Sequence, residues 1–238
     1  MSMKRRITAK EMADFIKESQ RLVFLTGAGV SVPSGIPDYR SVTGLYTKSG
    51  LKAPEYLLSR RALLRDTVDF HRFIAQLYQK EARPNVIHEA MAHLEKEKQV
   101  TVITQNIDGL HTVAGSKNVV EFHGTLADCY CETCGQTVAV DTFLKAPTHE
   151  TCGGLVRPAV VLYDEGIDQT CVNQAYDALV AADTVVIVGT SFQVYPFASL
   201  IEFAKNDAKI LTINKTHVDV ARTQAFYVGD ATDVFSLL

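Results

Sequence analysis

The chain lacks a long apolar stretch and an excess of either charge. No run comes near the roughly 20 apolar residues of a membrane-spanning helix, and the start has no apolar signal-peptide core. Lys and Arg number 24 against 27 Asp and Glu, so the formal net charge is −3 and no nucleic-acid footprint is visible. The basic run Lys4-Arg5-Arg6 is interpreted as a solvated terminus. We therefore expect a cytoplasmic protein that binds neither membrane nor nucleic acid.

Low-complexity tracts and a disulfide framework are also missing. The composition, 47% hydrophobic and 21% charged over 238 residues, suits one large globular domain or one that carries a smaller insertion. Of the five cysteines, three crowd together at Cys129, Cys131 and Cys134. Such crowding in a reducing compartment indicates a metal site. Cys171 lies on a helical pattern and is expected to pack.

Short apolar runs alternate with helical patterns along the chain. Thr8 and Glu11 have capping-box spacing before one such helix. Buried-strand runs alternating with helices predict an α/β fold: a doubly wound, mostly parallel, Rossmann-like sheet. The expected strands are Arg21–Thr26, Val100–Thr104, Val119–Phe122, Thr184–Val188 and Lys209–Ile213.

Two stretches break this alternation and are assigned to a smaller inserted domain. Residues 41–78 form its helical module, and residues 126–158 form its zinc-ribbon module. The large Rossmann-like domain then comprises residues 1–40, 79–125 and 159–238.

A glycine-rich turn follows the first strand. Gly27-Ala28-Gly29 begins a dinucleotide fingerprint, in which amides at the next helix N-terminus hold a pyrophosphate. The third glycine, Gly35, comes late, so the loop alone also fits a simple strand-to-helix turn. The whole run, Gly27-Ala-Gly-Val-Ser31 and then Ser34-Gly-Ile-Pro-Asp-Tyr-Arg40, resembles the NAD-binding loop of the sirtuin family, in its bacterial form of a single catalytic core.

The resemblance implies how this loop binds NAD as a co-substrate. Ala28 and the neighbouring amides would face phosphate, and an aromatic ring would shield the reactive ribose carbon. That ring is Tyr39 here, where the family has Phe. The implied cofactor residues of this segment are Gly27, Ala28, Gly29, Ser31, Asp38, Tyr39 and Arg40.

Polar residues follow the second strand, where ligands bind in open α/β sheets. Thr104-Gln-Asn-Ile-Asp108, then Leu110-His111, is similar to the sirtuin TQNID-x-LH pattern. The likeness implies that Gln105 and Asn106 hold the nicotinamide-side ribose, and that Ile107 and Asp108 engage the carboxamide. Asn106 and Asp108 thereby count among the catalytic residues.

A third strand ends at His123. A lone histidine at a strand end is commonly structural, but Gly124 is expected to leave its backbone side open, and Glu121-Phe-His-Gly124 resembles the sirtuin ELHG element. In that element the histidine is the general base, a role suited to an ordinary pKa of ~6.5. The resemblance implies that the acyl oxygen attacks the ribose as nicotinamide leaves. His123 then deprotonates a ribose hydroxyl, and water frees the lysine and O-acyl-ADP-ribose.

Cys131-Glu-Thr-Cys134 is half of a zinc ribbon, and His149-Glu-Thr-Cys152 offers the other half. Sirtuins carry four cysteines in this module, so His149 replaces the third. The predicted ligands of a structural Zn²⁺ are Cys131, Cys134, His149 and Cys152, with Cys129 as a possible substitute ligand and a metal-free module as the alternative.

The substrate side resembles two further sirtuin elements. Arg157-Pro-Ala-Val-Val-Leu-Tyr-Asp-Glu165 is similar to RP-x-x-V-x-F-G-E, where an acyl-lysine peptide adds as a strand. Asp164 replaces the glycine, and would either favour basic peptides or lie in solvent. Gly189-Thr-Ser-Phe-Gln-Val-Tyr-Pro196 is similar to GTSL-x-V-x-P. The implied substrate residues are Val161, Tyr163, Asp164, Glu165 and Val194, and the remaining implied cofactor residues are Gly189, Thr190, Ser191, Asn214 and Ala231.

Acyl preference and activity complete the prediction. A Tyr-x-x-Arg pair marks sirtuins that remove acidic acyl groups, and those positions hold His71 and Ile74 here, which favours acetyl or longer apolar chains. We expect a monomeric NAD-dependent deacylase acting on acyl-lysine proteins. ADP-ribosyl transfer to protein on the same fold is the nearest alternative, and a non-catalytic NAD-sensing module is the next.

Overall fold

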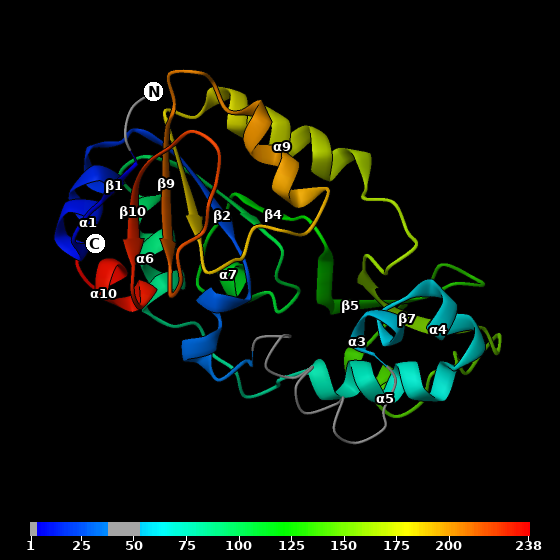
Figure 1. Cartoon of the computed structure of the whole chain (residues 1–238). Coiled ribbons are helices and arrows are strands. Elements are labelled where there is room, and N and C mark those ends of the chain that lie inside the picture. The colour runs from blue at the N-terminus through cyan, green and yellow to red at the C-terminus, as the bar shows by residue number, and fades with distance from the viewer. Residues whose placement is uncertain (1–3, 38–52) are drawn as a thin grey trace.

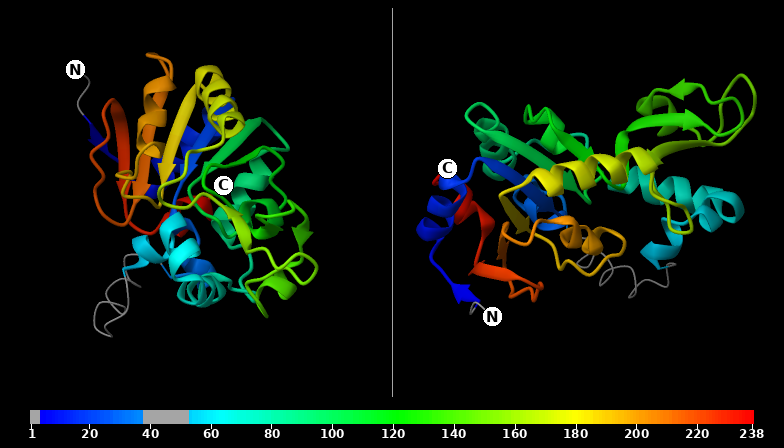
Figure 2. Two further views of the ribbon diagram at one scale, coloured as in Figure 1. Left: turned by 90° about the vertical axis from the view of Figure 1, so that its right-hand side faces the viewer. Right: turned by 90° about the horizontal axis from the view of Figure 1, so that it is seen from above.

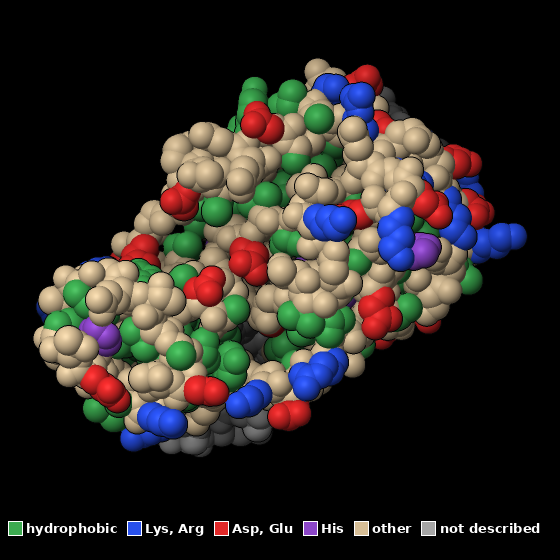
Figure 3. Space-filling view, turned by 180° about the vertical axis from the view of Figure 1, so that it is seen from behind, with side chains coloured by type: hydrophobic (Ala, Val, Ile, Leu, Met, Phe, Trp, Pro, Cys, Tyr) green, Lys and Arg blue, Asp and Glu red, His purple; other side chains and the backbone are tan. Residues whose placement is uncertain are grey.

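The computed structural model describes residues 4–37 and 53–238. The chain forms a larger and a smaller lobe (Figure 1), and the surface is hollowed between them (Figure 3). In the described residues the larger lobe holds a seven-stranded sheet of order β1-β10-β9-β8-β2-β3-β4, with every pairing parallel. Its strands are β1 (Arg5–Arg6), β2 (Arg21–Thr26), β3 (Gln99–Thr104), β4 (Val119–Glu121), β8 (Thr184–Val188), β9 (Lys209–Asn214) and β10 (Thr223–Val228). The predicted α/β, Rossmann-like class is confirmed.

Helices cover both faces of this sheet (Figures 1 and 2). Consecutive side chains of a strand point to opposite faces, so Phe24 joins one core and Leu25 the other. Both side chains are fully buried. One face is covered by α1 (Ala9–Glu18), α6 (Val86–Leu94) and α10 (Ala231–Phe235), and the other by α9 (Gln169–Ala181) and the 3₁₀ helix η4 (Phe197–Phe203).

Local sequence sets where these helices begin. Thr8 and Glu11 form the predicted capping box at the start of α1. The Asn85 side chain caps α6 by accepting from the Ile87 N–H, and Asp168 caps α9 in the same way. Among the described residues no helix is both long and apolar enough to cross a membrane.

The smaller lobe has its own sheet and core. Its three antiparallel strands are β5 (Gly124–Cys131), β6 (Thr137–Val138) and β7 (Val156–Val160). They pack with α3 (Pro54–Leu57), α4 (Arg60–Arg65), α5 (Thr67–Leu77) and α8 (Val140–Phe143). This sheet extends beyond the predicted segment 126–158 at both ends, and the division into two domains stays a prediction.

The basic N-terminal run is not a free terminus. Arg5 and Arg6 form an edge strand beside β10, although both side chains stay exposed. An edge strand needs backbone partners on one side only, which lets charged side chains remain in water. Lys4 pairs with Asp219, and Arg5 pairs with Glu11.

Strand order creates one topological switch point. The chain passes from β2 to its neighbour β3 on one side, and later enters β8 on the other side of β2. In open parallel sheets a crevice forms outside the carboxyl ends of strands at such a point, and ligands bind there.

Candidate active site

Two glycine-containing loops touch at the switch point. The Gly29 N–H donates to the Gly189 carbonyl oxygen at 2.8 Å. A Cβ atom on Gly29 would lie 2.7 Å from the Gly189 Cα, and Gly189 itself has a φ of +62°. Glycine is therefore required on both sides of this contact. The loops after β2 and β8, both predicted to hold NAD, lie against each other.

Within residues 27–37, the described part of the loop after β2 contains no α-helix. It forms two short 3₁₀ turns, η1 (Ala28–Val30) and η2 (Val32–Ser34). The expected helix N-terminus is that of the short 3₁₀ helix η1, and Gly35, at a φ of +85°, ends the second turn. The predicted residues Asp38, Tyr39 and Arg40 lie outside the described residues.

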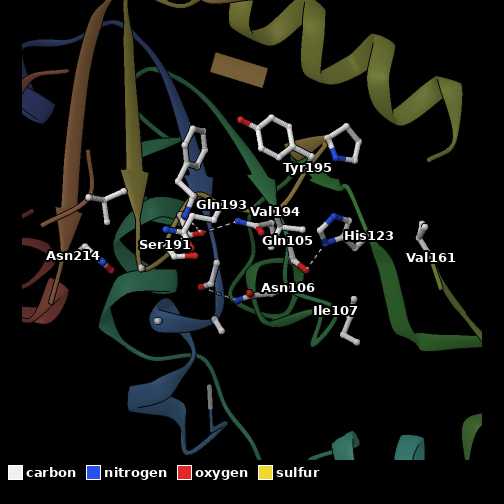
Figure 4. Close-up of a pocket in the computed structure, with 18 of the residues that line it drawn as sticks. Gln105, Asn106, Ile107, His123, Val161, Ser191, Gln193, Val194, Tyr195 and Asn214 are labelled. Carbon is white, nitrogen blue, oxygen red and sulfur yellow. Dashed lines mark hydrogen bonds between the residues drawn. The ribbon is translucent and has the colours of Figure 1, made fainter. Parts of the chain in front are cut away.

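The side chains after β3 turn back to both loops. Asn106 is buried, and its Nδ2 donates to the Gly27 carbonyl at 3.2 Å and to Ser31 Oγ at 3.0 Å. Gln105 Nε2 donates to Thr190 Oγ1 at 2.9 Å. These bonds link the three loops into one polar floor (Figure 4).

Asp108 is oriented from both sides. Ser31 Oγ donates to its Oδ2 at 2.6 Å, and the Leu110 N–H donates to its Oδ1 at 2.9 Å, at the start of α7 (Leu110–Val113). Ser31 and Asp108 do not line the cavity with the other predicted cofactor residues. They connect to it through Asn106.

Two buried histidines lie under this floor, and the sequence analysis assigned neither of them a role. His88 Nδ1 accepts from the Asn85 N–H at 3.3 Å, so the proton of the neutral ring lies on Nε2, which faces Ser31 Oγ at 3.4 Å. His111 Nε2 lies 3.1 Å from Thr26 Oγ1. Burial lowers the pKa of His88 to about 4 and that of His111 to about 3. The Asn85-x-x-His88 capping-box spacing was the only signal in the sequence.

His123 is held through one ring nitrogen. Its Nδ1 lies 3.2 Å from the Gln105 carbonyl oxygen, which only accepts, so Nδ1 carries the proton and donates it (Figure 4). The Nε2 atom is then an unprotonated acceptor. Burial lowers the pKa of His123, while the bond to Gln105 works weakly against this. The geometry is that of a neutral general base.

Gly124 plays a different part from the expected one. A Cβ atom there would collide with the carbonyl oxygen of Ala159 in β7, and the residue has a φ of +75°. The backbone side is therefore closed by β7 rather than open. Gly124 is needed for this close approach, which also brings the Val161 N–H to the His123 carbonyl oxygen at 2.9 Å.

One cavity of about 1120 Å³ collects the predicted residues. This volume is slightly above the range of about 300–1,000 Å³ that is typical of small-molecule sites. Across it Asn214 lies on one side, Asn106 and His123 lie between, and Val161 lies on the other (Figure 4). The predicted residues that line it are Gly27, Ala28, Gly29, Gln105, Asn106, Ile107, His123, Val161, Tyr163, Asp164, Glu165, Gly189, Thr190, Ser191, Val194, Asn214 and Ala231.

The predicted substrate residues differ in character. Tyr163 and Val194 are 51% and 40% exposed at the cavity. Glu165 instead forms an ion pair within the protein: Arg157 donates two hydrogen bonds, of 2.5 and 2.9 Å, to its carboxylate. Arg157 is buried, and together the two side chains fix the segment that follows β7.

The two positions used for acyl preference lie away from the cavity. His71 Nε2 lies 2.6 Å from the Phe143 carbonyl oxygen, and Ile74 is buried in the core of the smaller lobe. Neither is among the residues that line the cavity. The preference for apolar acyl groups stays a prediction.

The predicted metal ligands meet in one cluster. The ligand atoms of Cys131, Cys134, His149 and Cys152 all lie within 4.8 Å of one another. Neighbouring pairs are separated by 3.5 Å (Cys131–Cys152), 3.4 Å (Cys134–His149) and 3.2 Å (His149–Cys152). Zn–S bonds of ~2.3 Å in a tetrahedron separate the sulfurs by roughly 3.8 Å, so the set fits zinc. All four positions come from protein, as in structural sites.

Cys129 is not part of this cluster. Its side chain is buried in the core of the smaller lobe, and burial, with the charge of Asp128, raises its pKa to about 11. The possibility that it substitutes for His149 is therefore not supported by the geometry.

Comparison with known sequences agrees with the site. The model of the Sir2 family matches residues 27–196. The NAD-dependent protein deacetylase of Listeria monocytogenes is 49% identical over 226 residues, which cover 94% of this chain and 98% of the relative. That of Enterococcus faecalis is 45% identical over 232 residues, covering 98% and 97%.

Solved structures that are similar to this chain are also Sir2 proteins. A Sir2 homolog–NAD complex has a TM-score of 0.88 at 33% identity, covering 99% of this chain and 94% of that one. A Sir2 complex with a deacetylated p53 peptide and 3′-O-acetyl-ADP-ribose has a TM-score of 0.86 at 30% identity, covering 97% of both chains. Sir2Tm bound to a propionylated peptide has a TM-score of 0.85 at 30% identity, covering 97% and 96%.

Proposed function

The chain belongs to the Sir2 family, and from this premise we propose that it uses NAD to remove acetyl or other apolar acyl groups from protein lysines. It is an NAD-dependent protein-lysine deacylase that releases nicotinamide and O-acyl-ADP-ribose. Its substrates are acyl-lysine proteins, in line with the peptide complexes of its structural relatives.

The observation that carries this proposal is the state of His123. Because Nδ1 donates to the Gln105 carbonyl oxygen, the free Nε2 can accept a proton inside the cavity. NAD, when bound, supplies the ADP-ribose unit that takes the acyl group as nicotinamide leaves. His123 Nε2 removes the proton from a ribose hydroxyl and thereby makes it a nucleophile.

The neighbouring side chains would position rather than transfer protons. Asn106 and Gln105 hold the ribose at the polar floor, where both are already fixed by bonds to the glycine loops. Asp108, oriented by Ser31 and the Leu110 N–H, would receive the carboxamide. Such preorganised side chains need little rearrangement when the substrates bind.

Zinc would act structurally. Cys131, Cys134, His149 and Cys152 fill a tetrahedral set, which leaves no position for water to be activated. The ion would tie the turn after β5, with Cys131 and Cys134, to the segment before β7, with His149 and Cys152. The thiol ligands also suit a reducing compartment, and we propose the cytoplasm.

Two further proposals concern organisation. Residues 1–40, 79–125 and 159–238 would form the NAD-binding domain, and residues 41–78 and 126–158 the smaller domain, supported by the separate hydrophobic core of that lobe. We propose that the protein acts as a monomer. We also propose that it does not bind nucleic acid, in line with its net charge of −3.

The test is mass spectrometry of an acetyl-lysine peptide incubated with NAD and either wild-type protein or His123→Ala. Loss of the acetyl group only with NAD and wild type, with O-acetyl-ADP-ribose formed, supports the proposal. Release of nicotinamide with an unchanged peptide and a heavier acceptor protein would instead establish ADP-ribosyl transfer. NAD binding with no nicotinamide release would indicate a sensor.

A further inference from the structure

A tight turn forms one rim of the cavity beside the proposed peptide path. Residues 162–165 close it through a bond from the Glu165 N–H to the Leu162 carbonyl oxygen at 3.0 Å. Asp164, the third residue, has a φ of +75°, which makes the turn of the type II kind. Tyr163 joins it to the segment before α4, since its N–H donates to the Leu58 carbonyl oxygen at 2.9 Å.

Hydrogen bonds to the Glu165 carboxylate hold this turn in place. The Glu165 carboxylate accepts two bonds from Arg157 and a third, of 2.9 Å, from the Leu162 N–H. Arg60 NH1 lies 3.2 Å from the same carboxylate and also pairs with Glu132. The two arginines balance the two glutamates, so this network adds no net charge to the rim.

Asp164 stands apart from that network. Its side chain is exposed at the cavity, and no ion pair or hydrogen bond engages it in the described part of the chain. The left-handed backbone of this position is the one glycine adopts without strain, and the sirtuin pattern has glycine here. A strained residue at a ligand site points to a functional reason for its side chain.

A second carboxylate lies at the same cavity, near Tyr163. Glu55, in the first turn of α3, is exposed, lines the same cavity and makes no ion pair among the described residues. Its charge adds to burial in raising the pKa of the Tyr163 phenol, which places it close to that ring. Among the described residues Lys215 is the one lysine that lines the cavity; it neighbours Asn214 in the chain and pairs with Asp230.

We infer that Asp164, assisted by Glu55, makes this deacylase prefer acyl-lysines flanked by lysine or arginine. The inference rests on the proposed function, because it assigns the sequence context of the same substrate. The rim holds two uncompensated carboxylates and no compensating cation among the described residues. A cationic side chain next to the acyl-lysine would be attracted to these carboxylates, whereas an acidic one would be repelled.

The expected preference is modest. Exposed ion pairs have small coupling energies, equivalent to about a 2- to 5-fold difference in kcat/KM per flanking cation. The effect should weaken as salt rises from 0.05 to 0.5 M, roughly, because the pairs are solvent-exposed.

The experiment measures kcat/KM for acetyl-lysine peptides that differ only in having Arg, Ala or Glu on either side of the acetyl-lysine. The wild type is compared with Asp164→Asn, which removes the charge while keeping a residue that tolerates the left-handed backbone. Glu55→Gln removes the second charge. Asp207→Asn, which alters net charge equally at an exposed position outside the cavity, is the control.

The Arg-to-Glu ratio of kcat/KM should fall towards one in Asp164→Asn, fall partly in Glu55→Gln and stay unchanged in Asp207→Asn. A wild type that processes all peptides at equal rates overturns this inference and leaves the proposed function standing. A preference that survives in Asp164→Asn also overturns it. A wild type that deacylates no peptide overturns the proposed function itself.

Discussion

The Nδ1 atom of His123 lies 3.2 Å from the carbonyl oxygen of Gln105. Gln105 directly follows β3, and its side chain is expected to hold the ribose. The bond to its backbone fixes the orientation and the tautomer of the His123 ring. The proposed general base and the residue proposed to hold the ribose are thus positioned by one short segment.

The first prediction concerns the pH dependence of turnover. Burial lowers the pKa of His123 from 6.5, so the ring loses its proton at a lower pH than a free imidazole. A general base must be neutral to act. We expect kcat/KM to be nearly constant around pH 7 and to decline only on acidification below about pH 6.5. Initial rates from pH 5 to 8 test this, and a limb centred above pH 7 would contradict the assignment.

A second prediction concerns acid stability. Burial lowers the pKa of His88 from 6.5 to about 4, against a weaker opposite effect of Asp108. Between these values the unfolded chain binds more protons than the folded protein, so stability is lost as the pH falls through this window. The loss at pH 5 should be about 2 kcal/mol from this residue.

His88→Gln is the matched variant, because glutamine at this position keeps the capping box with Asn85 and does not titrate. Unfolding free energies at pH 7 and pH 5 should differ less in His88→Gln than in wild type, by about 2 kcal/mol. Equal differences in the two proteins would mean that His88 titrates normally in the fold.

A third prediction concerns the contact between the glycine loops. Gly29→Ala would bring a Cβ atom to 2.7 Å from the Gly189 Cα, and should cost about 2 kcal/mol or more of stability and weaken NAD binding. Gly166→Ala is the control, because Gly166 has no atom within 4 Å of its Cβ position. That variant should stay within about 0.5 kcal/mol of wild type. Thermal unfolding and NAD titration distinguish the two, and equal behaviour would contradict the close approach.

The parts that could be predicted are those encoded locally. β8, Thr184–Val188, is buried along its whole length and was recognisable from its β-branched run. Asn106 and His123 could be located because each follows a strand of the sheet and lies in a segment that resembles a sirtuin motif.

The parts that could not be predicted depend on tertiary contacts. Nothing near His88 in the sequence says that α6 brings it beneath Ser31. The different environments of Glu165 and Asp164 could not be predicted. They differ because the buried Arg157 forms hydrogen bonds with Glu165 and not with Asp164. The closed backbone at Gly124 likewise depends on β7, which lies far along the chain.

A fourth prediction tests the metal ligands. His149→Cys should retain one zinc per chain, because it restores four thiolates at the same spacing, whereas His149→Ala should lose zinc and unfold at lower temperature. Cys129→Ala should keep the metal, since that side chain lies in the core. Metal content by mass spectrometry and melting temperatures measure this. Zinc loss in Cys129→Ala with retention in His149→Ala would reverse the ligand assignment.

The fifth prediction separates backbone strain from charge at the cavity rim. Asp164 adopts a φ of +75°, where a Cβ atom costs roughly 1 kcal/mol that glycine avoids. Asp164→Gly should therefore raise the unfolding free energy by about 0.5 to 1 kcal/mol at neutral pH, even though glycine loses more entropy on folding. Asp164→Asn should change it little, because asparagine keeps the side-chain volume and the strain. Chemical denaturation of both variants measures this. If both variants gained the same stability, removal of the charge would explain the gain. The left-handed backbone of Asp164 would then not lower the unfolding free energy.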